Sequence, residues 1–105
     1  MKLSDIGSRI AKLRMETGVS ARDMSLSLGK YDNYINKLEN NKAYPSMSAL
    51  YDICEYLRIS PKDFFDDGND YPTRINDVVS ELKRLDRSAL TNVEGIVKEM
   101  NRKYK

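Results

Sequence analysis

Apolar residues recur every three or four positions along most of the chain, and this spacing predicts a fold built of helices alone. Residues three and four apart share one face of an α-helix, so each such series marks a face that can be buried. Around a first helix predicted over 4–17, the series is Leu3, Ile6, Ile10 and Leu13. Strands would need strict alternation of apolar and polar residues, a pattern that we do not find in the sequence. We therefore expect an all-α protein.

Capping and helix-breaking residues divide residues 1–67 into five predicted helices. Ser and Asp side chains accept hydrogen bonds from the first turn of a helix, and Gly or Asn tolerates the left-handed conformation that ends one. The expected N-caps are Ser4, Ser20, Asp32 (or no side chain for the third helix), Ser46 and Ser60, and the expected breaks are Gly18, Gly29 and 40–42. The residues expected to join the first helix in one core are Met24, Leu28, Ile35, Leu38, Leu50, Ile53, Cys54, Leu57, Phe64 and Phe65.

The polar run over 66–70 is the best candidate for a domain boundary. It separates a first domain, residues 1–67, from a C-terminal segment, residues 70–105. In that segment Pro72 and Asp86 open two further helices, each with an apolar stripe. The stripes are Tyr71, Ile75, Val78, Leu82 and Leu85 in one, and Leu90, Val93, Val97, Met100 and Tyr104 in the other. They predict a two-helix hairpin.

The hairpin carries more apolar surface than one chain can cover, because two helices meet along one seam each and Val79 and Ile96 widen both faces. We expect a second copy of the chain to bury the rest in a symmetric dimer. The expected interface residues are Ile75, Val79, Leu82, Leu90, Val93, Ile96, Val97 and Met100. Alternatively, the hairpin packs on the first domain or binds a different protein. Gly95 marks either a close crossing by another helix or a weak spot in its own.

Residues 21–38 carry the spacing of a helix-turn-helix. A small residue, Ser25, stands where the two helices would touch, and Gly29 suits the left-handed turn between them. Ile35 and Leu38, six and nine residues after the glycine, can lock the second helix onto the first. In DNA-binding proteins with this motif, the second helix lies in the major groove.

From Leu3 to Phe65 the chain resembles the lambda-repressor-like (Xre-family) helix-turn-helix domain. The matching pieces are Ile6-x3-Ile10-x2-Leu13-Arg14, Gly18-Val19-Ser20, Leu28-Gly29, Ile35-x2-Leu38-Glu39-Asn40, Lys42, Pro45-Ser46, Leu50-x2-Ile53-Cys54 and Ser60-Pro61-x2-Phe64-Phe65. The resemblance implies a five-helix DNA-binding domain, here followed by the C-terminal two-helix hairpin.

The resemblance also implies roles for individual residues. The base readers would be Asp32, Asn33, Tyr34, Asn36 and Lys37, and DNA phosphates would be contacted by Arg22, Asn40, Lys42 and Ser46. Asn can form two hydrogen bonds with adenine, and Lys can donate to guanine. Arg14 would pair with Glu39 and tie the first helix to the end of the third.

Three positions depart from the family pattern. Ala21 replaces the usual Gln, so the phosphate contact of that Gln is absent here, and Arg22 is the candidate to substitute for it. Tyr31 replaces Ser or Thr, which leaves the third helix capped by Asp32 or by no side chain; if Asp32 caps, it does not read bases. Asn41 replaces a glycine, which the tolerance of Asn for left-handed backbone allows. The tyrosines at 31, 34, 44, 51 and 56 are expected to serve packing and interfaces rather than base stacking.

Composition argues against several other functions. The sequence has no His and a single Cys, so we expect no metal site, no catalytic residues and no cofactor, and Cys54 is expected to be a core thiol. We find no run of about 20 apolar residues and no secretory signal, so we expect a cytoplasmic protein, encoded by a bacterium or phage, with no membrane partner.

The function predicted from these observations is sequence-specific binding of double-stranded DNA by a homodimer that represses transcription. An antagonist protein at the C-terminal hairpin is a further expected partner. The net charge of only +2 is low for a nucleic-acid-binding protein. The alternative is therefore a protein-interaction module, such as an antitoxin or a partner adaptor, built on a helix-turn-helix domain.

Overall fold

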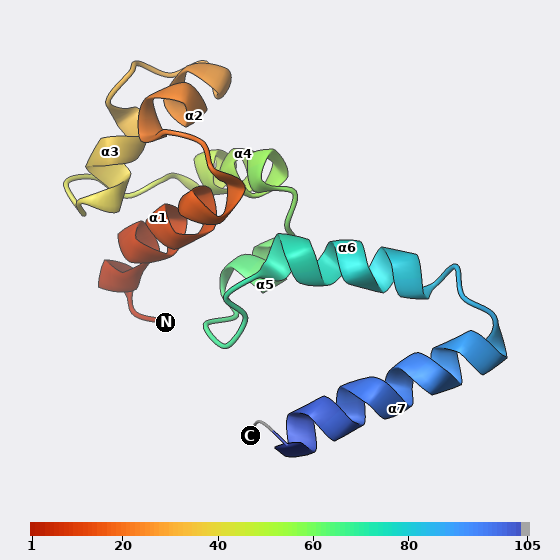
Figure 1. Cartoon of the computed structure of the whole chain (residues 1–105). Coiled ribbons are helices and arrows are strands. Elements are labelled where there is room, and N and C mark those ends of the chain that lie inside the picture. The colour runs from red at the N-terminus through yellow and green to blue at the C-terminus, as the bar shows by residue number, and fades with distance from the viewer. Residues whose placement is uncertain (104–105) are drawn as a thin grey trace. The chain divides into compact units, whose positions relative to one another are not determined.

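Left-handed backbone at Gly18, Gly29 and Asn41 divides the first half of the chain into its helices. In the computed structural model, which describes residues 1–103, the φ angles of these residues are 77°, 73° and 57°. The described residues form seven α-helices and one short 3-10 helix, and no strand is found among them (Figure 1). The prediction of an all-α protein is confirmed.

The elements follow one another with short connections. They are η1 (Leu3–Asp5), α1 (Ile6–Thr17), α2 (Ala21–Ser27), α3 (Tyr34–Glu39), α4 (Met47–Leu57), α5 (Pro61–Phe64), α6 (Pro72–Leu82) and α7 (Arg87–Lys103). Helix α1 packs against α3 and α4, α2 packs against α3, and α4 packs against α5. These contacts fix α3, the second helix of the helix-turn-helix, between α1 and α2.

Three of the predicted serine caps are present. The hydroxyl oxygens of Ser20, Ser46 and Ser60 accept hydrogen bonds from the backbone N–H three residues later, at 3.0, 3.1 and 3.0 Å. The predicted cap at Ser4 is wrong, because η1 occupies this stretch and α1 begins only at Ile6. Leu3 is 60% exposed, so its predicted place on the buried face of the first helix is also wrong.

One core forms where α1 to α5 meet, and its largest fully buried side chains include Ile10, Met24, Ile35 and Phe64. Cys54 is buried there too, and burial raises the pKa of its thiol, so the group packs as a neutral core side chain. Phe65 is wrong as a core residue, since it is 45% exposed. It follows Phe64 by about 100° of helical rotation, so only one of the two rings can point inward.

A buried arginine holds the end of α5. Arg9 is 5% exposed, and its guanidinium donates hydrogen bonds to the backbone oxygens of Phe64 (2.7 Å), Asp63 (2.8 Å) and Asp66 (3.0 Å). The last carbonyls of a helix have no partner within the helix, and Arg9 supplies a donor to that of Phe64, the last residue of α5. This role was not predicted, although Arg9 lies three residues after Ile6 and therefore on the apolar face of α1.

Helix α1 approaches the end of α3 so closely that only glycine fits at position 7. A Cβ atom on Gly7 would lie 2.5 Å from the backbone oxygen of Leu38 and 2.8 Å from that of Glu39. Atoms at such distances must shift, and backbone oxygens cannot move without distorting α3. Gly7 therefore sets the distance between α1 and α3.

The described chain divides into two compact units, one over Met1–Thr73 and one that begins at Arg74. The first unit extends past the polar run 66–70. Pro72 is buried, the Thr73 hydroxyl donates to the backbone oxygen of Leu57 at 2.9 Å, and the Lys12 ammonium lies 2.6 Å from the Asp70 carboxylate. No described helix is long and apolar enough to cross a membrane.

The second unit exposes its apolar stripes. Asp86 caps α7 as predicted, since its carboxylate accepts from the Ala89 N–H at 2.8 Å. Within the described part of α7 no residue is buried, and Ile75 and Val78 of α6 are 50% and 56% exposed. One chain by itself therefore does not close the seam expected between the two helices. Tyr104, predicted to end the second stripe, lies outside the described residues.

Gly95 is on the opposite side of α7 from the stripe. It stands two residues from both Val93 and Val97, which corresponds to about 200° of helical rotation. A Cβ added there would meet nothing within 4 Å. Of the two interpretations of Gly95, this position favours the weak spot over a close crossing at the apolar face.

Candidate nucleic-acid interface

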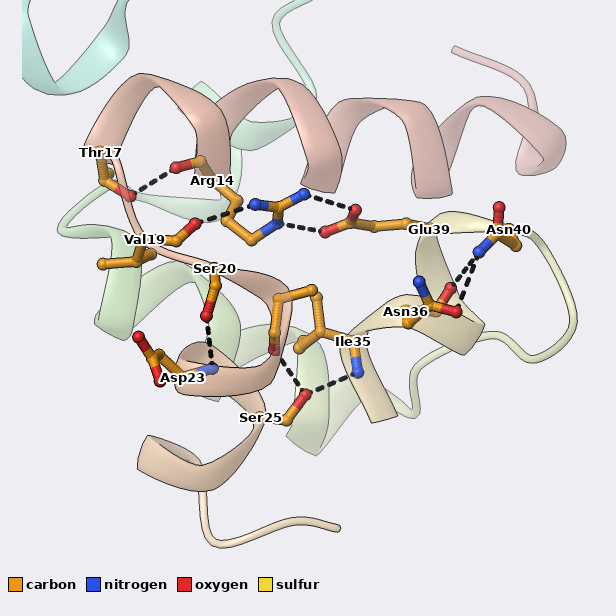
Figure 2. Close-up of polar contacts among 11 residues, drawn as sticks. Arg14, Thr17, Val19, Ser20, Asp23, Ser25, Ile35, Asn36, Glu39 and Asn40 are labelled. Atoms are coloured by element: carbon orange, nitrogen blue, oxygen red, sulfur yellow. Dashed lines mark hydrogen bonds and ion pairs between the residues drawn. The ribbon is translucent and has the colours of Figure 1, made fainter. Parts of the chain in front are cut away.

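Ser25 joins the two helices of the helix-turn-helix. It is completely buried, its hydroxyl donates to the backbone oxygen of Ala21 at 2.7 Å, and it accepts from the N–H of Ile35 at 2.9 Å (Figure 2). Ile35 is in the first turn of α3, where backbone N–H groups have no partner within the helix. The sequence predicted a small residue here, but the hydrogen bond also requires a hydroxyl.

The turn between α2 and α3 gives a direct test of this motif. We expect Gly29→Val to lower the free energy of unfolding by more than about 1 kcal/mol, because a β-branched side chain is strained at the positive φ of 73°. Gly29→Asn is the control and should lose less, since Asn tolerates left-handed backbone. Urea unfolding followed by circular dichroism measures both. Equal stability of the Val variant and the wild type would contradict the assignment of the turn.

Arg14 and Glu39 tie α1 to the end of α3. The guanidinium and the carboxylate form two parallel contacts of 2.6 and 2.9 Å, and Arg14 also donates to the backbone oxygen of Val19 at 2.8 Å (Figure 2). Their side chains are only 14% and 10% exposed. The hydrogen bond with Glu39 raises the pKa of Arg14, against the opposite effect of burial. The contact implied by the family resemblance is confirmed.

The five residues predicted to read bases lie in or just before α3. Asn33 is exposed at the N-cap position of α3, and its side chain makes no capping hydrogen bond. Asp32 does not cap the helix either; its carboxylate lies 4.0 Å from the guanidinium of Arg22, with both side chains exposed. Tyr34 is partly buried against the core, and Lys37 is partly buried.

Asn36 already has a side-chain partner. The Asn40 amide donates to the side-chain oxygen of Asn36 at 3.1 Å and to its backbone oxygen at 2.8 Å (Figure 2). To form its two hydrogen bonds with adenine, an Asn side chain uses both its oxygen and its NH2 group. Asn36 would therefore share its oxygen with Asn40, whereas Asn33 offers both groups, which makes Asn33 the better candidate reader.

The residues predicted to contact phosphate flank α3 on both sides in sequence. Lys42 is exposed in the loop after α3, and Arg22 is exposed on α2. Ser46 uses its oxygen to accept from Ala49, so only its hydroxyl hydrogen remains for another acceptor. Asn41, between Asn40 and Lys42, donates to the backbone oxygen of Ser4 at 3.0 Å and so fastens this loop to the start of the chain.

Sequence reasoning missed one feature of this surface. Tyr31, expected to serve packing and interfaces, is 54% exposed three residues before α3 begins, and the ammonium of Lys37 is 5.3 Å from the centre of its ring. The sequence did not indicate this contact, because Tyr31 and Lys37 are six residues apart and do not belong to one helix.

The comparisons with known proteins agree with this geometry. Over 55 residues the chain is 29% identical to an uncharacterized HTH-type transcriptional regulator, y4dJ, of Sinorhizobium fredii (strain NBRC 101917 / NGR234), which covers 52% of this chain and 71% of that protein. No solved structure matches significantly. The profile of the family described as "Helix-turn-helix domain" matches residues 7–68, more than half of the chain. The chain therefore belongs to the helix-turn-helix domain family.

Proposed function

We propose that this chain is a DNA-binding transcription regulator of the lambda-repressor-like (Xre) type, and that it represses transcription with α3 in the major groove of its operator. The arrangement of α3 carries this proposal. Ser25 and the Arg14–Glu39 pair hold the helix from its two ends, while Asn33 remains exposed at its start. A rigid helix with an outward-facing amide is suited to reading base edges. The relative named as a transcriptional regulator supports the same role.

A single domain of this kind contacts one half-site, so we further propose that two copies bind together. Half-sites on one face of DNA are about 34 Å apart, one helical turn. The exposed stripes of α6 and α7 supply a surface that a second copy can cover, with Val79, Leu90, Val97 and Met100 each 40–55% exposed in one chain. An antagonist protein that occupied the same surface would release the repressor from DNA.

Selection of duplexes from a randomised DNA library by the full chain tests the proposed function. We expect enrichment of one sequence with approximate two-fold symmetry, because a symmetric dimer presents two identical α3 helices. A library that stays random after repeated rounds would contradict DNA reading. It would favour the protein-interaction module, which the net charge of +2 also permits.

The roles of individual residues predict different patterns of loss. Asn33→Ala should cost about 1–3 kcal/mol in binding to the enriched duplex and much less on a scrambled duplex, since base contacts carry the sequence information. Lys42→Ala should weaken binding to both duplexes alike and reduce the salt slope by about one, as expected of a phosphate contact. Fluorescence anisotropy at several salt concentrations measures both. Equal losses on the two duplexes for Asn33→Ala would rule it out as a base reader.

A further inference from the structure

Two lysines and two tyrosines form a continuous series of contacts around the start of α3. The Lys37 ammonium lies 5.3 Å from the ring centre of Tyr31. The Tyr31 ring meets that of Tyr34 edge to face, with centres 5.7 Å apart and planes at 83°. The Lys30 ammonium lies 5.4 Å from the ring centre of Tyr34. We call these four residues the Lys–Tyr ladder; its contacts all fall within the usual ranges for cation–π and aromatic pairs.

One residue of the Lys–Tyr ladder, Tyr34, is anchored in the protein interior. Tyr34 packs against the hydrophobic core, and burial, together with nearby Tyr31 and Asp52, raises the pKa of its phenol, so it stays neutral. Tyr31 is not among the residues packed on the core and is 54% exposed. Tyr31 therefore rests on Tyr34 and presents its face to Lys37, a residue on α3 itself.

On the basis of the proposed function, we propose that Tyr31 is a positioning residue that holds the Lys37 ammonium on the DNA-facing surface of α3 and so contributes to sequence specificity. A free lysine side chain samples many rotamers and loses that freedom when it binds. The Tyr31 ring restricts the rotamers of the Lys37 side chain already in the protein without DNA. It engages only one side of the ammonium, so N–H groups remain for a guanine acceptor.

Five variants of the full chain test this inference. Tyr31→Phe keeps the aromatic face, Tyr31→Leu removes it at similar bulk, Lys37→Met removes the cation, and the fourth combines Tyr31→Leu with Lys37→Met. Tyr51→Leu is the matched control, because Tyr51 is 57% exposed on α4 and outside the ladder. The probes are the duplex enriched by the wild-type chain and a scrambled duplex of the same composition.

We expect Tyr31→Leu to weaken binding to the enriched duplex about two- to fivefold, the equivalent of an exposed cation–π contact, with less change on the scrambled duplex. Tyr31→Phe and Tyr51→Leu should bind as the wild type does. In the Lys37→Met background the Tyr31→Leu loss should disappear, since there is no ammonium left to position. Selection with Tyr31→Leu should also show a weaker base preference at the position that Lys37→Met relaxes.

Three binding results would overturn the inference. They are Tyr31→Leu binding as tightly as the wild type, losses of affinity that add in the double variant, or Tyr31→Phe losing as much affinity as Tyr31→Leu.

Nuclear magnetic resonance measures the contact between Tyr31 and Lys37 without DNA. The Lys37 side-chain protons should show ring-current shifts in the wild type and in Tyr31→Phe but not in Tyr31→Leu. Absence of these shifts in the wild type would also refute it. Normal shifts together with no enriched duplex would instead refute the proposed function, and the positioning role with it.

Discussion

Replacement of Arg9 by Met should lower the free energy of unfolding by about 2–4 kcal/mol, because hydrogen bonds to a charged donor contribute more than neutral ones and the buried Phe64 carbonyl loses its donor. Three contacts to backbone oxygens of Asp63, Phe64 and Asp66 would be lost at once. Met keeps the length of the aliphatic stem, so the loss would reflect the guanidinium rather than a cavity. The end of α5 and the packing of Phe64 should loosen together.

Two further variants isolate this effect in urea unfolding measurements. Lys12→Met is the matched control on the same helix: its ion pair with Asp70 is half exposed, and such pairs contribute about 0–1 kcal/mol. Arg9→Lys keeps the charge but cannot spread its donors over three oxygens, so its stability should lie between those of Arg9→Met and the wild type. A loss below about 0.5 kcal/mol for Arg9→Met would mean that water satisfies the carbonyls equally well.

The parts of the fold that were predictable from sequence are those with local causes. The caps at Ser20, Ser46, Ser60 and Asp86 act on N–H groups three residues away, so a short window contains both partners. Left-handed backbone at Gly29 is likewise a property of one residue and its neighbours. The helical period then selects the buried face of each helix, and Ile35 and Leu38 of α3 are buried as expected.

The unpredicted features have distant partners. Arg9 and Phe64 are 55 positions apart, and Gly7 meets the end of α3, so neither role can be inferred before the helices are placed. Helical period also fails at element ends, where Leu3 and Phe65 fit the apolar spacing but face solvent. There the chain has left the helix, or a neighbouring residue already fills the inward position.

The candidate interface was predictable as a region but not in its internal contacts. The helix-turn-helix spacing located α3, and the family resemblance supplied its candidate base readers. The side-chain pairs Asn36–Asn40 and Arg22–Asp32 and the Lys–Tyr ladder depend on rotamers in three dimensions. These pairs distinguish Asn33, which makes no capping bond, from Asn36, which has a partner, a difference that the sequence alone did not indicate.

Removal of residues 74–105 should leave a folded monomer and weaken binding to the enriched duplex about 100-fold or more. The core residues all lie before Arg74, so the remaining unit keeps its packing, and a chain that ends at Thr73 retains the Thr73–Leu57 bond. The loss of affinity arises because two linked half-site contacts act at a high effective concentration, an advantage that separate monomers lack. Light scattering and fluorescence anisotropy measure the two effects.

Two substitutions in the full chain test whether the proposed dimer forms through the apolar stripe of α7 rather than through chain length alone. Val97→Glu places a charge on the stripe, at a side chain 49% exposed in one chain, and should yield monomers with the same weakened binding. Gly95→Glu introduces the same residue on the opposite face, where a Cβ meets nothing within 4 Å, and should leave the dimer intact. If the wild-type chain is itself monomeric at micromolar concentration, the exposed stripes must serve a different protein, and truncation would then leave DNA binding unchanged.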